Sequence, residues 1–485
     1  MTKKKSKFSS TPPIASDINE ANALISELWE QLRHYEDRLK TSSANSSKSP
    51  SSDGPKERAE RKKPQSSSGR NPRGAKQGHE GHKRQLSELK ESDTTVGCYP
   101  ENTCPCCGDS NLEMSDKPFY RHQVHEISPP RIDITEYRLY SGKCTQCGET
   151  VKAQKPSDVP QGIMGPNLMS HIAILAGQYH LSVRKIRSLL QEQFGTTFSV
   201  GAISEAQSRI ASMLTPLHQA IKANIQSAPL VHVDETSHSR NDEERLRWCW
   251  LVASDDLVYE KILYSRSTHS AKTVLDSDYC GIVVSDQYSG YNWLSQDKHQ
   301  LCWSHVIRNL QQIADYSGKG HTAKIGQRLV QLSKLVFRTR HRWEAGKIDD
   351  ALYLNRLNRL RCRFNQWLDK GATQIPIQRY QGRCRKLKEH SQSLWLFLTN
   401  PKIPLTNNEA ERRLRGFVIQ RKISYGTTSD AGDKFRDRVQ SLIETCKKRQ
   451  ISSLKTLTRI VTAVISRQPY PNVFDLNEAS FYANS

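Results

Sequence analysis

Two aspartates carry the clearest potential for chemistry in this sequence. Asp234 follows an apolar run at residues 230–233, and Asp286 follows a second one at 281–284. Each is therefore expected at the carboxyl end of a buried strand, where open α/β sheets form their clefts. Carboxylates from adjacent strands can hold divalent cations together, and Mg²⁺ prefers oxygen ligands. The pair predicts a site in which two Mg²⁺ ions activate a water or hydroxyl and stabilise a leaving oxygen.

A third carboxylate is expected from a helix for which Asn407 or Asn408 is a suitable N-cap. This helix offers two acids, Glu409 and Glu411. Glu411 can point inward, while Glu409 lies about 200° around the axis. Taken singly, such acids fit ordinary strand ends and helix surfaces. Together, and in this order, the two aspartates and Glu411 favour a metal site.

The net charge points to an anionic partner. Lys and Arg number 72 and Asp and Glu 50, which gives +22 over 485 residues. The charge is uneven, because residues 201–300 hold 9 basic and 13 acidic side chains (net −4) and residues 301–400 hold 19 and 6 (net +13). Nucleic acid is the usual partner of so basic a chain, and the alternative is a merely soluble basic protein. This layout suits a carboxylate site flanked by a phosphate-binding surface.

Two groups of cations are candidates for binding DNA phosphates, the alternative being solvated basic faces. One surrounds the third acid. The other lies in the first helix of a segment with the layout helix, Gly195 turn and helix. This segment is either a helix-turn-helix, whose second helix would enter the major groove, or an ordinary helical hairpin. The candidates are Arg412, Arg413, Arg415, Arg421 and Lys422 in the first group, and Arg184 and Lys185 in the second.

Five cysteines fall in two matching clusters, CPCCG and CTQCG, with 36 residues between them. Each cluster can offer two thiolates from one tight turn, in which the glycine supplies a positive φ. Four thiolates leave no open position, so the predicted metal is a structural Zn²⁺. Free thiols or a redox pair are the alternative, and Cys106 can in principle replace Cys104. The predicted ligands are Cys104, Cys107, Cys144 and Cys147.

A smaller pair, Cys302 and His305 in the segment CWSH, follows the second aspartate. One interpretation is that the pair positions the active site or a DNA end. The other is a core cysteine and a packed histidine, which we favour because two ligands alone do not make a zinc site.

Several classes of protein are excluded by composition. No apolar run approaches the ~20 residues of a membrane span, and the N-terminal lysines have no apolar stretch behind them, so a secretory signal is not expected. Twelve cysteines are too sparse for a disulfide scaffold. We therefore expect a protein of the reducing cytosol.

Periodicity predicts the main elements. A heptad stripe over residues 25–39 indicates a helix over about 17–40, either a dimer zipper or a helix docked on the chain's own body. Residues 41–85 are polar and basic and indicate a disordered linker, whose cations can follow DNA or simply keep it solvated. Residues 122–139 predict a β-hairpin, residues 166–213 helices, 228–286 strands with one short helix, and 300–396 basic helices. The tryptophans of that last segment are expected in its core, namely Trp303, Trp343, Trp367 and Trp395.

In several motifs the sequence resembles the IS66-family DDE transposases over almost its whole length. The resemblance rests on NSSKSPSSD, CPCCG…CTQCG, HVDET, SDQYSGY, CWSHVIRNL, NNEAERRLR and RKISYGTTSDAG, in the family's order. It implies an RNase H-like α/β core with an α-helical insertion, preceded by a zinc-ribbon-like finger and a helical DNA-binding region. It also implies the metal-binding triad Asp234, Asp286 and Glu411, and Mg²⁺-dependent cleavage and joining of insertion-sequence ends.

The resemblance implies partners as well. These are double-stranded DNA of the element ends and of the target, a second copy of the chain, and accessory proteins of the same element, which would associate the protein with the nucleoid. Departures lie in the linker (RGAKQGHEGH), in the few heptads and in the tail after Ile451. A catalytically silent DNA-binding protein is the alternative, and a general RNase H-like nuclease is a third interpretation.

The combined prediction divides the chain into eight segments. They are an amphipathic or zipper-like helix (1–40), a disordered basic linker (41–90), a zinc finger (95–160), a helical DNA-binding region (161–225), the first part of the core (226–300), a basic helical insertion (301–400), the second part of the core (401–450) and a C-terminal tail (451–485).

Overall fold

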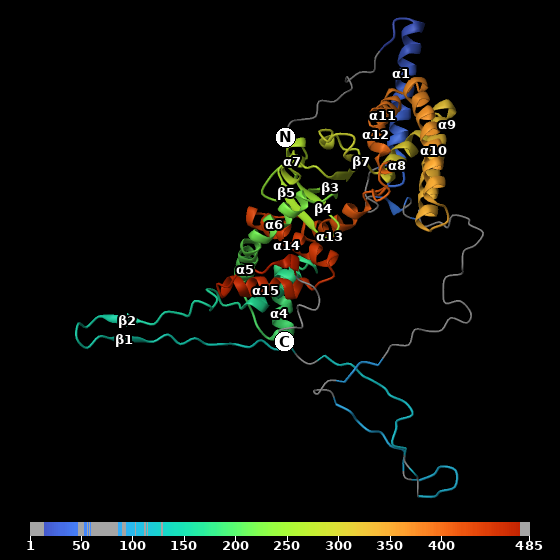
Figure 1. The fold of residues 1–485 in the computed structure, drawn as a ribbon. Coiled ribbons are helices and arrows are strands. Elements are labelled where there is room, and N and C mark those ends of the chain that lie inside the picture. The colour runs from blue at the N-terminus through green and yellow to red at the C-terminus, as the bar shows by residue number, and fades with distance from the viewer. Residues whose placement is uncertain are drawn as a thin grey trace.

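The computed structural model describes residues 14–46, 94–101, 103–110, 115–127 and 130–475, together with a few residues at 53–59, 86–89 and 113. Most of the predicted linker lies outside the described residues. Figure 1 shows a body built on a β-sheet, a helical lobe beside it, and two extended arms that carry the cysteine clusters.

The sheet has five strands in the order β5-β4-β3-β6-β7. Strands β5, β4 and β3 pair antiparallel, whereas β6 and β7 run parallel to β3. The prediction found four of these strands and missed β7. Asp234 does not end its strand as predicted, because β3 continues to His238 by pairing with β4. The strands are β3 (Leu230–His238), β4 (Arg247–Ala253), β5 (Val258–Leu263), β6 (Ile282–Ser285) and β7 (His299–Leu301).

One face of the sheet shares a large apolar core with surrounding helices. Strand residues such as Val233 and Trp250 pack there with helix residues such as Ile203 and Val439. The helices are α3 (Pro166–Gly177), α4 (Val183–Phe194), α5 (Val200–Met213), α6 (Thr215–Gln226), α7 (Thr268–Val274), α14 (Asp430–Lys448) and α15 (Ser453–Ile465). Helix α4 ends at Gly195, whose φ of 63° permits the predicted turn into α5.

The segment after residue 450 is not merely a tail. Helix α15 follows α14 and buries Leu457, Ile460 and Val461 in the same core. The prediction was wrong because it relied on a poor match to the family and overlooked an apolar period of three and four residues, which indicates a helix.

Helix α14 also protects the open edge of the sheet. The backbone N–H of Val258 donates to Thr445 Oγ1 at 3.0 Å, and that of Glu260 donates to Ser441 Oγ at 2.8 Å. These outward N–H groups of β5 would otherwise remain unpaired at a sheet edge. Side-chain hydroxyl groups of α14 thus accept the hydrogen bonds that a sixth strand would otherwise accept.

The helical insertion lies between β7 and α13 (Asn408–Ser424) and has its own apolar core. Trp303 and Trp395 meet edge to face there, with ring centroids 4.9 Å apart. The predicted core role is confirmed for these two, while Trp343 and Trp367 are only partly buried at its border. The insertion helices are α8 (Trp303–Ala314), α9 (Gly320–Glu344), α10 (Asp350–Gln374), α11 (Gln378–Glu389) and α12 (Ser391–Leu394).

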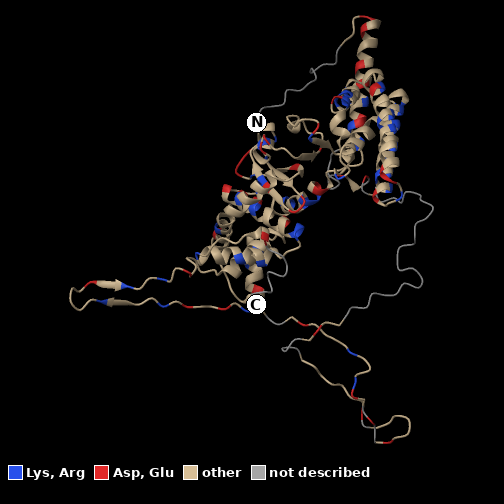
Figure 2. Cartoon of the chain, in the orientation of Figure 1, with Lys and Arg blue, Asp and Glu red and all other residues tan. Residues whose placement is uncertain are grey.

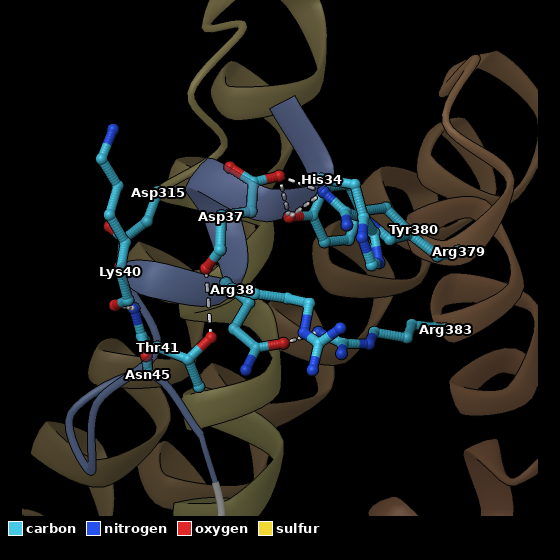
Figure 3. A pocket seen from close by; sticks show the side chains of 11 residues that line it. His34, Asp37, Arg38, Lys40, Thr41, Asn45, Asp315, Arg379, Tyr380 and Arg383 are labelled. Carbon is cyan, nitrogen blue, oxygen red and sulfur yellow. Dashed lines mark hydrogen bonds and ion pairs between the residues drawn. The ribbon is translucent and has the colours of Figure 1, made fainter. Parts of the chain in front are cut away.

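The N-terminal helix α1 (Ile18–Leu39) attaches to this insertion by polar contacts (Figure 3). Asp37 accepts hydrogen bonds from the Tyr380 hydroxyl at 3.1 Å and from the Ser317 N–H at 3.2 Å, and it forms an ion pair with Arg379. A polar pocket of about 200 Å³ lies at this junction. The predicted helix is confirmed, but the apolar stripe is not what docks, because Leu28 and Leu32 stay 51% and 61% exposed.

The predicted hairpin at residues 122–139 is wrong. Residues 121–127 and 130–140 form no strand, and the hairpin is instead β1 (Ser141–Lys143) with β2 (Thr150–Lys152), which flanks the second cysteine cluster. Alternating residues such as Val124 and Ile134 are 79% and 90% exposed. Alternation specifies a strand only when one face has a layer to pack against, and the described residues provide no such layer for this arm.

Gly326 allows α9 to lie directly on the last turn of α8. A Cβ at this position would stand 2.3 Å from the Ala314 nitrogen and 2.6 Å from the Ile313 carbonyl carbon. Gly326→Ala is therefore expected to lower the free energy of unfolding by about 1–3 kcal/mol, because the two backbones must separate. Chemical denaturation measures this loss.

Gly382→Ala on α11 is the matched control. No atom lies within 4 Å of the Cβ it would add, so the expected change is neutral or a gain of up to about 1 kcal/mol. Equal unfolding free energies for the two variants would contradict the close helix approach.

Candidate functional site

The register of β3 and β6 brings Asp234 and Asp286 together. Leu230 pairs with Ile282 and His232 pairs with Val284 in this parallel ladder. Two residues further along each strand stand Asp234 and Asp286, at equivalent positions just beyond the last pair. Because side chains alternate along a strand, equivalent positions on parallel neighbours present both carboxyl groups on one face.

The electrostatics show that the carboxyl groups are crowded. Burial raises the pKa of Asp234 well above its usual range, and the charges of Glu235, Asp286 and Glu411 raise that pKa further. Burial also raises the pKa of Asp286, although the nearby Arg266 and Arg308 oppose this effect. Acids that repel each other in a cavity favour the binding of a cation.

Glu411 reaches this cluster because Asn407 fixes the start of α13. The buried Asn407 side chain donates to Val233 O at 2.8 Å and accepts from His232 Nδ1 at 3.0 Å, so it joins the helix to the strand of Asp234. Its own N–H donates to Cys302 Sγ at 3.1 Å. Asn407 is the predicted N-cap residue, but its side chain makes no capping bond and holds the neighbouring strand instead.

The structure separates the two glutamates of α13. Glu409 accepts from Lys448 Nζ at 2.6 Å and from Arg413 Nε at 3.0 Å. Burial would raise the pKa of Glu409, but these two cations lower it to about 2. Glu411 instead faces Arg308, with 3.4 Å between Nη2 and Oε1. Glu409 is thus neutralised in an internal ion pair, as expected for the acid on the other side of the helix.

Cys302 and His305 lie beside Glu411 where the insertion begins. Both are buried, and burial raises the pKa of Cys302 to about 11. Burial, with the charge of Arg308, lowers the pKa of His305 to about 3, so the ring is neutral. Its Nδ1 stands 3.6 Å from Glu411 Oε1, which is too far for a hydrogen bond. The predicted packed cysteine and histidine are therefore also direct neighbours of the third acid.

Sequence reasoning missed two parts of the site, a cluster around Glu235 and the single residue Arg308. Glu235 is buried, accepts from Arg266 Nε at 2.7 Å, and also accepts from the Tyr291 hydroxyl. The Arg266 guanidinium lies over the Tyr288 ring, 3.8 Å from its centroid. The signal was present in the HVDET and SDQYSGY segments, which contain Glu235, Tyr288 and Tyr291.

Arg308, the second omission, follows His305 by three residues in CWSHVIRNL and so lies on the same face of α8. Its charge opposes the negative potential of Asp286 and Glu411. The helical spacing alone could have identified it.

The predicted cationic residues fall into two groups. Arg413 binds Glu409 and Glu444, and Arg421 donates to Ser237 Oγ at 2.7 Å, so both hold the fold together rather than offering free guanidinium groups. The others have exposed side chains, and their binding to DNA stays a prediction. They are Arg412, Arg415 and Lys422 on α13, with Arg184 and Lys185 on α4.

The helical insertion is covered with cations (Figure 2). Exposed basic residues follow the outer sides of α9 and α10, and the acidic groups there are few. Examples are Lys324, Arg328, Lys334, Arg338, Arg359, Arg361 and Arg363.

The two cysteine clusters form matching turns. Gly108 N–H donates to Cys104 O and Gly148 N–H to Cys144 O, both at 2.9 Å, and the glycines have φ of 76° and 73°. Hydrogen bonds from following backbone N–H groups lower the pKa of Cys104 and of Cys144.

These turns lie on separate arms (Figure 1), so the structure does not bring the four predicted zinc ligands together. Within the described part of the chain, a single group of three or more potential metal-ligating side chains has its ligand atoms within 4.8 Å of one another, and it is Cys302, His305 and Glu411.

None of the described helices is both long and apolar enough to cross a membrane. The fold and site define a mixed α/β protein with a carboxylate cluster at the junction of its sheet and a basic helical insertion. The model of the IS66 transposase family matches residues 161–434, which is more than half of the chain. The chain therefore belongs to the IS66 transposase family.

Other matches add little about activity. The model of a family of unknown function, DUF6444, matches residues 10–85. The uncharacterized protein y4hP of Sinorhizobium fredii is 22% identical over 421 residues, which cover 78% of this chain and 73% of y4hP. Protein y4jD of the same organism, also uncharacterized, is 22% identical over 404 residues, 76% of each chain.

The crowding of carboxylates predicts a pH-dependent change in stability. Because the folded state raises the pKa of Asp234, ionisation of this group destabilises the fold as the pH rises through that pKa. Without divalent cations at pH 8, Asp234→Asn is expected to be more stable than the wild type by on the order of 1 kcal/mol. The gain should shrink as the pH falls and vanish only below about 3, under the ordinary pKa of an aspartate near 4, where the wild-type group is protonated in both states.

Thermal unfolding at several pH values measures this difference. Asp278→Asn alters an exposed aspartate and should show no such gain. A lower stability of Asp234→Asn at pH 8 would mean that the carboxylate is not under repulsion.

Proposed function

We propose that this protein is a DNA transposase that cleaves and joins insertion-sequence ends through Asp234, Asp286 and Glu411. The observation that carries the proposal is the placement of Asp234 on β3 and of Asp286 directly after β6, each two residues beyond the last pair of these strands, with Glu411 held beside them by Asn407. Membership of the IS66 transposase family supports a transposase role. The strand order, three antiparallel strands followed by two parallel ones, supports an RNase H-like core.

The donor set fits Mg²⁺. Three carboxylates offer only oxygen ligands, and the pKa of Asp234 is raised first by burial and then by the charges of neighbouring acids, which divalent cations would offset. When bound, two Mg²⁺ ions supply charge stabilisation for the attacking and leaving oxygens of an in-line displacement. Asp234 and Asp286 would hold both ions, and Glu411 would complete the ligands of the second.

The chain's own residues set the geometry of this reaction. In the first step a water oxygen bonds to the scissile phosphorus and the 3′-oxygen of the element end leaves as a hydroxyl. In the second step this hydroxyl oxygen bonds to a phosphorus of the target DNA, and the 3′-oxygen of the target strand leaves that phosphorus as a hydroxyl. Arg308 lies where it can balance negative charge near Asp286 and Glu411. The basic insertion, on the chain between Asp286 and Glu411, offers a surface for the phosphate backbone.

Cleavage assays on DNA that carries the inverted repeats flanking the gene test the proposal. With Mg²⁺, the wild type is expected to nick at the repeat ends. Asp234→Ala, Asp286→Ala and Glu411→Ala should each lower the rate by more than about 100-fold, because each removes a group that stabilises charge in the transition state. Binding of the same DNA should persist, as measured by fluorescence anisotropy.

Glu409→Gln is the matched control, since it removes the other carboxylate of the same helical turn and should keep cleavage at temperatures where it is folded. Absence of wild-type cleavage with both Mg²⁺ and Mn²⁺, with DNA binding retained, would favour a silent DNA-binding protein. Cleavage without preference for the repeats would favour a general nuclease.

We propose further that Cys104, Cys107, Cys144 and Cys147 bind a structural Zn²⁺ when the two arms meet. The matching turns and the lowered pKa values of Cys104 and Cys144 support this role. Replacing Cys144 by Ser should remove one equivalent of zinc per chain, measured by plasma emission spectrometry. Cys106→Ser should retain that equivalent, and its loss would identify Cys106 as a ligand in place of Cys104.

A further inference from the structure

The starts of α8 and α13 are locked against each other. Trp303 N–H donates to Leu405 O at 2.9 Å, and Asn407 N–H donates to Cys302 Sγ at 3.1 Å. Cys302 therefore immediately precedes one helix, while His305 and Glu411 each stand in a first turn. Segments more than a hundred residues apart thus place a thiol, an imidazole and a carboxylate at one junction.

The three ligand atoms lie within 4.8 Å of one another. The His305 Nδ1 to Glu411 Oε1 distance of 3.6 Å is long for a hydrogen bond. Two ligands of one tetrahedral zinc ion are separated by roughly 3.3–3.6 Å, given its bond lengths of about 2.0–2.3 Å. The spacing is thus close to that of two ligands of a single ion.

His305 supplies an independent indication. The residue is only 8% exposed, and its Nδ1 is buried without a hydrogen-bond partner. An unpaired buried polar atom is costly, so such atoms are uncommon and call for a ligand. This nitrogen points toward the carboxylate of Glu411, whose side chain is 34% exposed and leaves a route from solvent.

We propose that Cys302, His305 and Glu411 form a binding site for a borderline divalent cation such as Zn²⁺. Sulfur, nitrogen and oxygen donors together suit zinc, whereas Mg²⁺ would be bound by oxygen ligands alone. Binding removes the proton of the Cys302 thiol, which passes to solvent. Three protein ligands leave a fourth position for water.

This site deepens the proposed function, because Glu411 belongs to both donor sets. A carboxylate engaged with zinc beside Cys302 and His305 is less able to complete the Mg²⁺ ligands with Asp234 and Asp286. The consequence, which rests on the proposed function, is that Zn²⁺ inhibits Mg²⁺-dependent cleavage by competing for Glu411.

Cobalt spectroscopy on the full-length chain tests the site without any cleavage assay. Serine first replaces the four predicted zinc ligands of the two cysteine clusters, so that no other predicted thiolate site remains. These ligands are Cys104, Cys107, Cys144 and Cys147. This chain is expected to bind one Co²⁺ with a thiolate-to-metal charge-transfer band, which Zn²⁺ displaces. Adding Cys302→Ser should abolish the band while keeping an acceptor for the Asn407 N–H.

His305→Gln and Glu411→Gln should each weaken Co²⁺ binding at least tenfold, and Glu411→Gln is the safer variant for folding because its side chain is partly exposed. Cys384→Ser, at a buried insertion cysteine outside the cluster, should leave the band unchanged. A missing band, or a band that survives Cys302→Ser or is insensitive to both other variants, would overturn the site.

The competition is tested on the wild-type chain by measuring end cleavage at fixed Mg²⁺ with increasing Zn²⁺. Inhibition should require at least tenfold more Zn²⁺ in Cys302→Ser than in Cys384→Ser. Equal sensitivity of the two variants would overturn the competition. If no chain cleaves DNA, the proposed function fails, while the cobalt result still decides whether the metal site exists.

Discussion

The buried side chain of Asn407 is the interaction on which the site depends. Its amide donates to Val233 O and accepts from His232 Nδ1, while its N–H donates to Cys302 Sγ. The amide nitrogen of Asn407 faces Val233 O, so the amide oxygen faces the His232 ring. Because an amide oxygen can only accept a hydrogen bond, the ring must donate through Nδ1. Three segments of the chain, β3, the start of α8 and the start of α13, therefore meet at one fully buried residue. Each bond contributes about 1 kcal/mol, but an unpaired partner would cost more, so the arrangement is fixed.

The carboxylate cluster destabilises the folded state, and contacts elsewhere in the fold offset this loss of stability. Burial raises the pKa of both aspartates, and neighbouring carboxylates raise that of Asp234 further, so the charged forms destabilise the fold. The apolar cores under the sheet and in the insertion keep the strands in place against this repulsion. A third core, in which Ala410, Leu414 and Phe417 pack on β4 and β5, keeps α13 in place. Arg266 and Arg308 reduce the local negative charge, and Glu409 is removed from the cluster by Lys448 and Arg413. The fold thus holds these carboxyl groups close together despite the cost of burying them.

Local patterns predicted much of the body and failed where a pattern had no packing partner. The strands around Asp234 and Asp286 were predictable because continuous apolar runs indicate buried strands. The short strand β7 has only three residues, His299–Leu301, and no such run. The alternating residues near Val124 formed no hairpin, since no layer among the described residues packs on them. The apolar stripe of α1 is exposed, and the helix is attached to the insertion through Asp37 instead. Arg413 and Arg421 looked like DNA ligands in sequence, but carboxylates and hydroxyls from distant segments bind them.

The sequence by itself determined which acids are candidates, the order of strands and helices around them, the two cysteine turns and the basic character of the insertion. These follow from side-chain periodicity, turn chemistry and charge, which act over a few residues. Only the tertiary structure decided that Asp234 and Asp286 share one register position, that Glu411 rather than Glu409 faces them, and that Cys302 and His305 have a third potential ligand. Those facts depend on the register of β3 with β6 and on hydrogen bonds between residues more than a hundred positions apart, which no local pattern encodes.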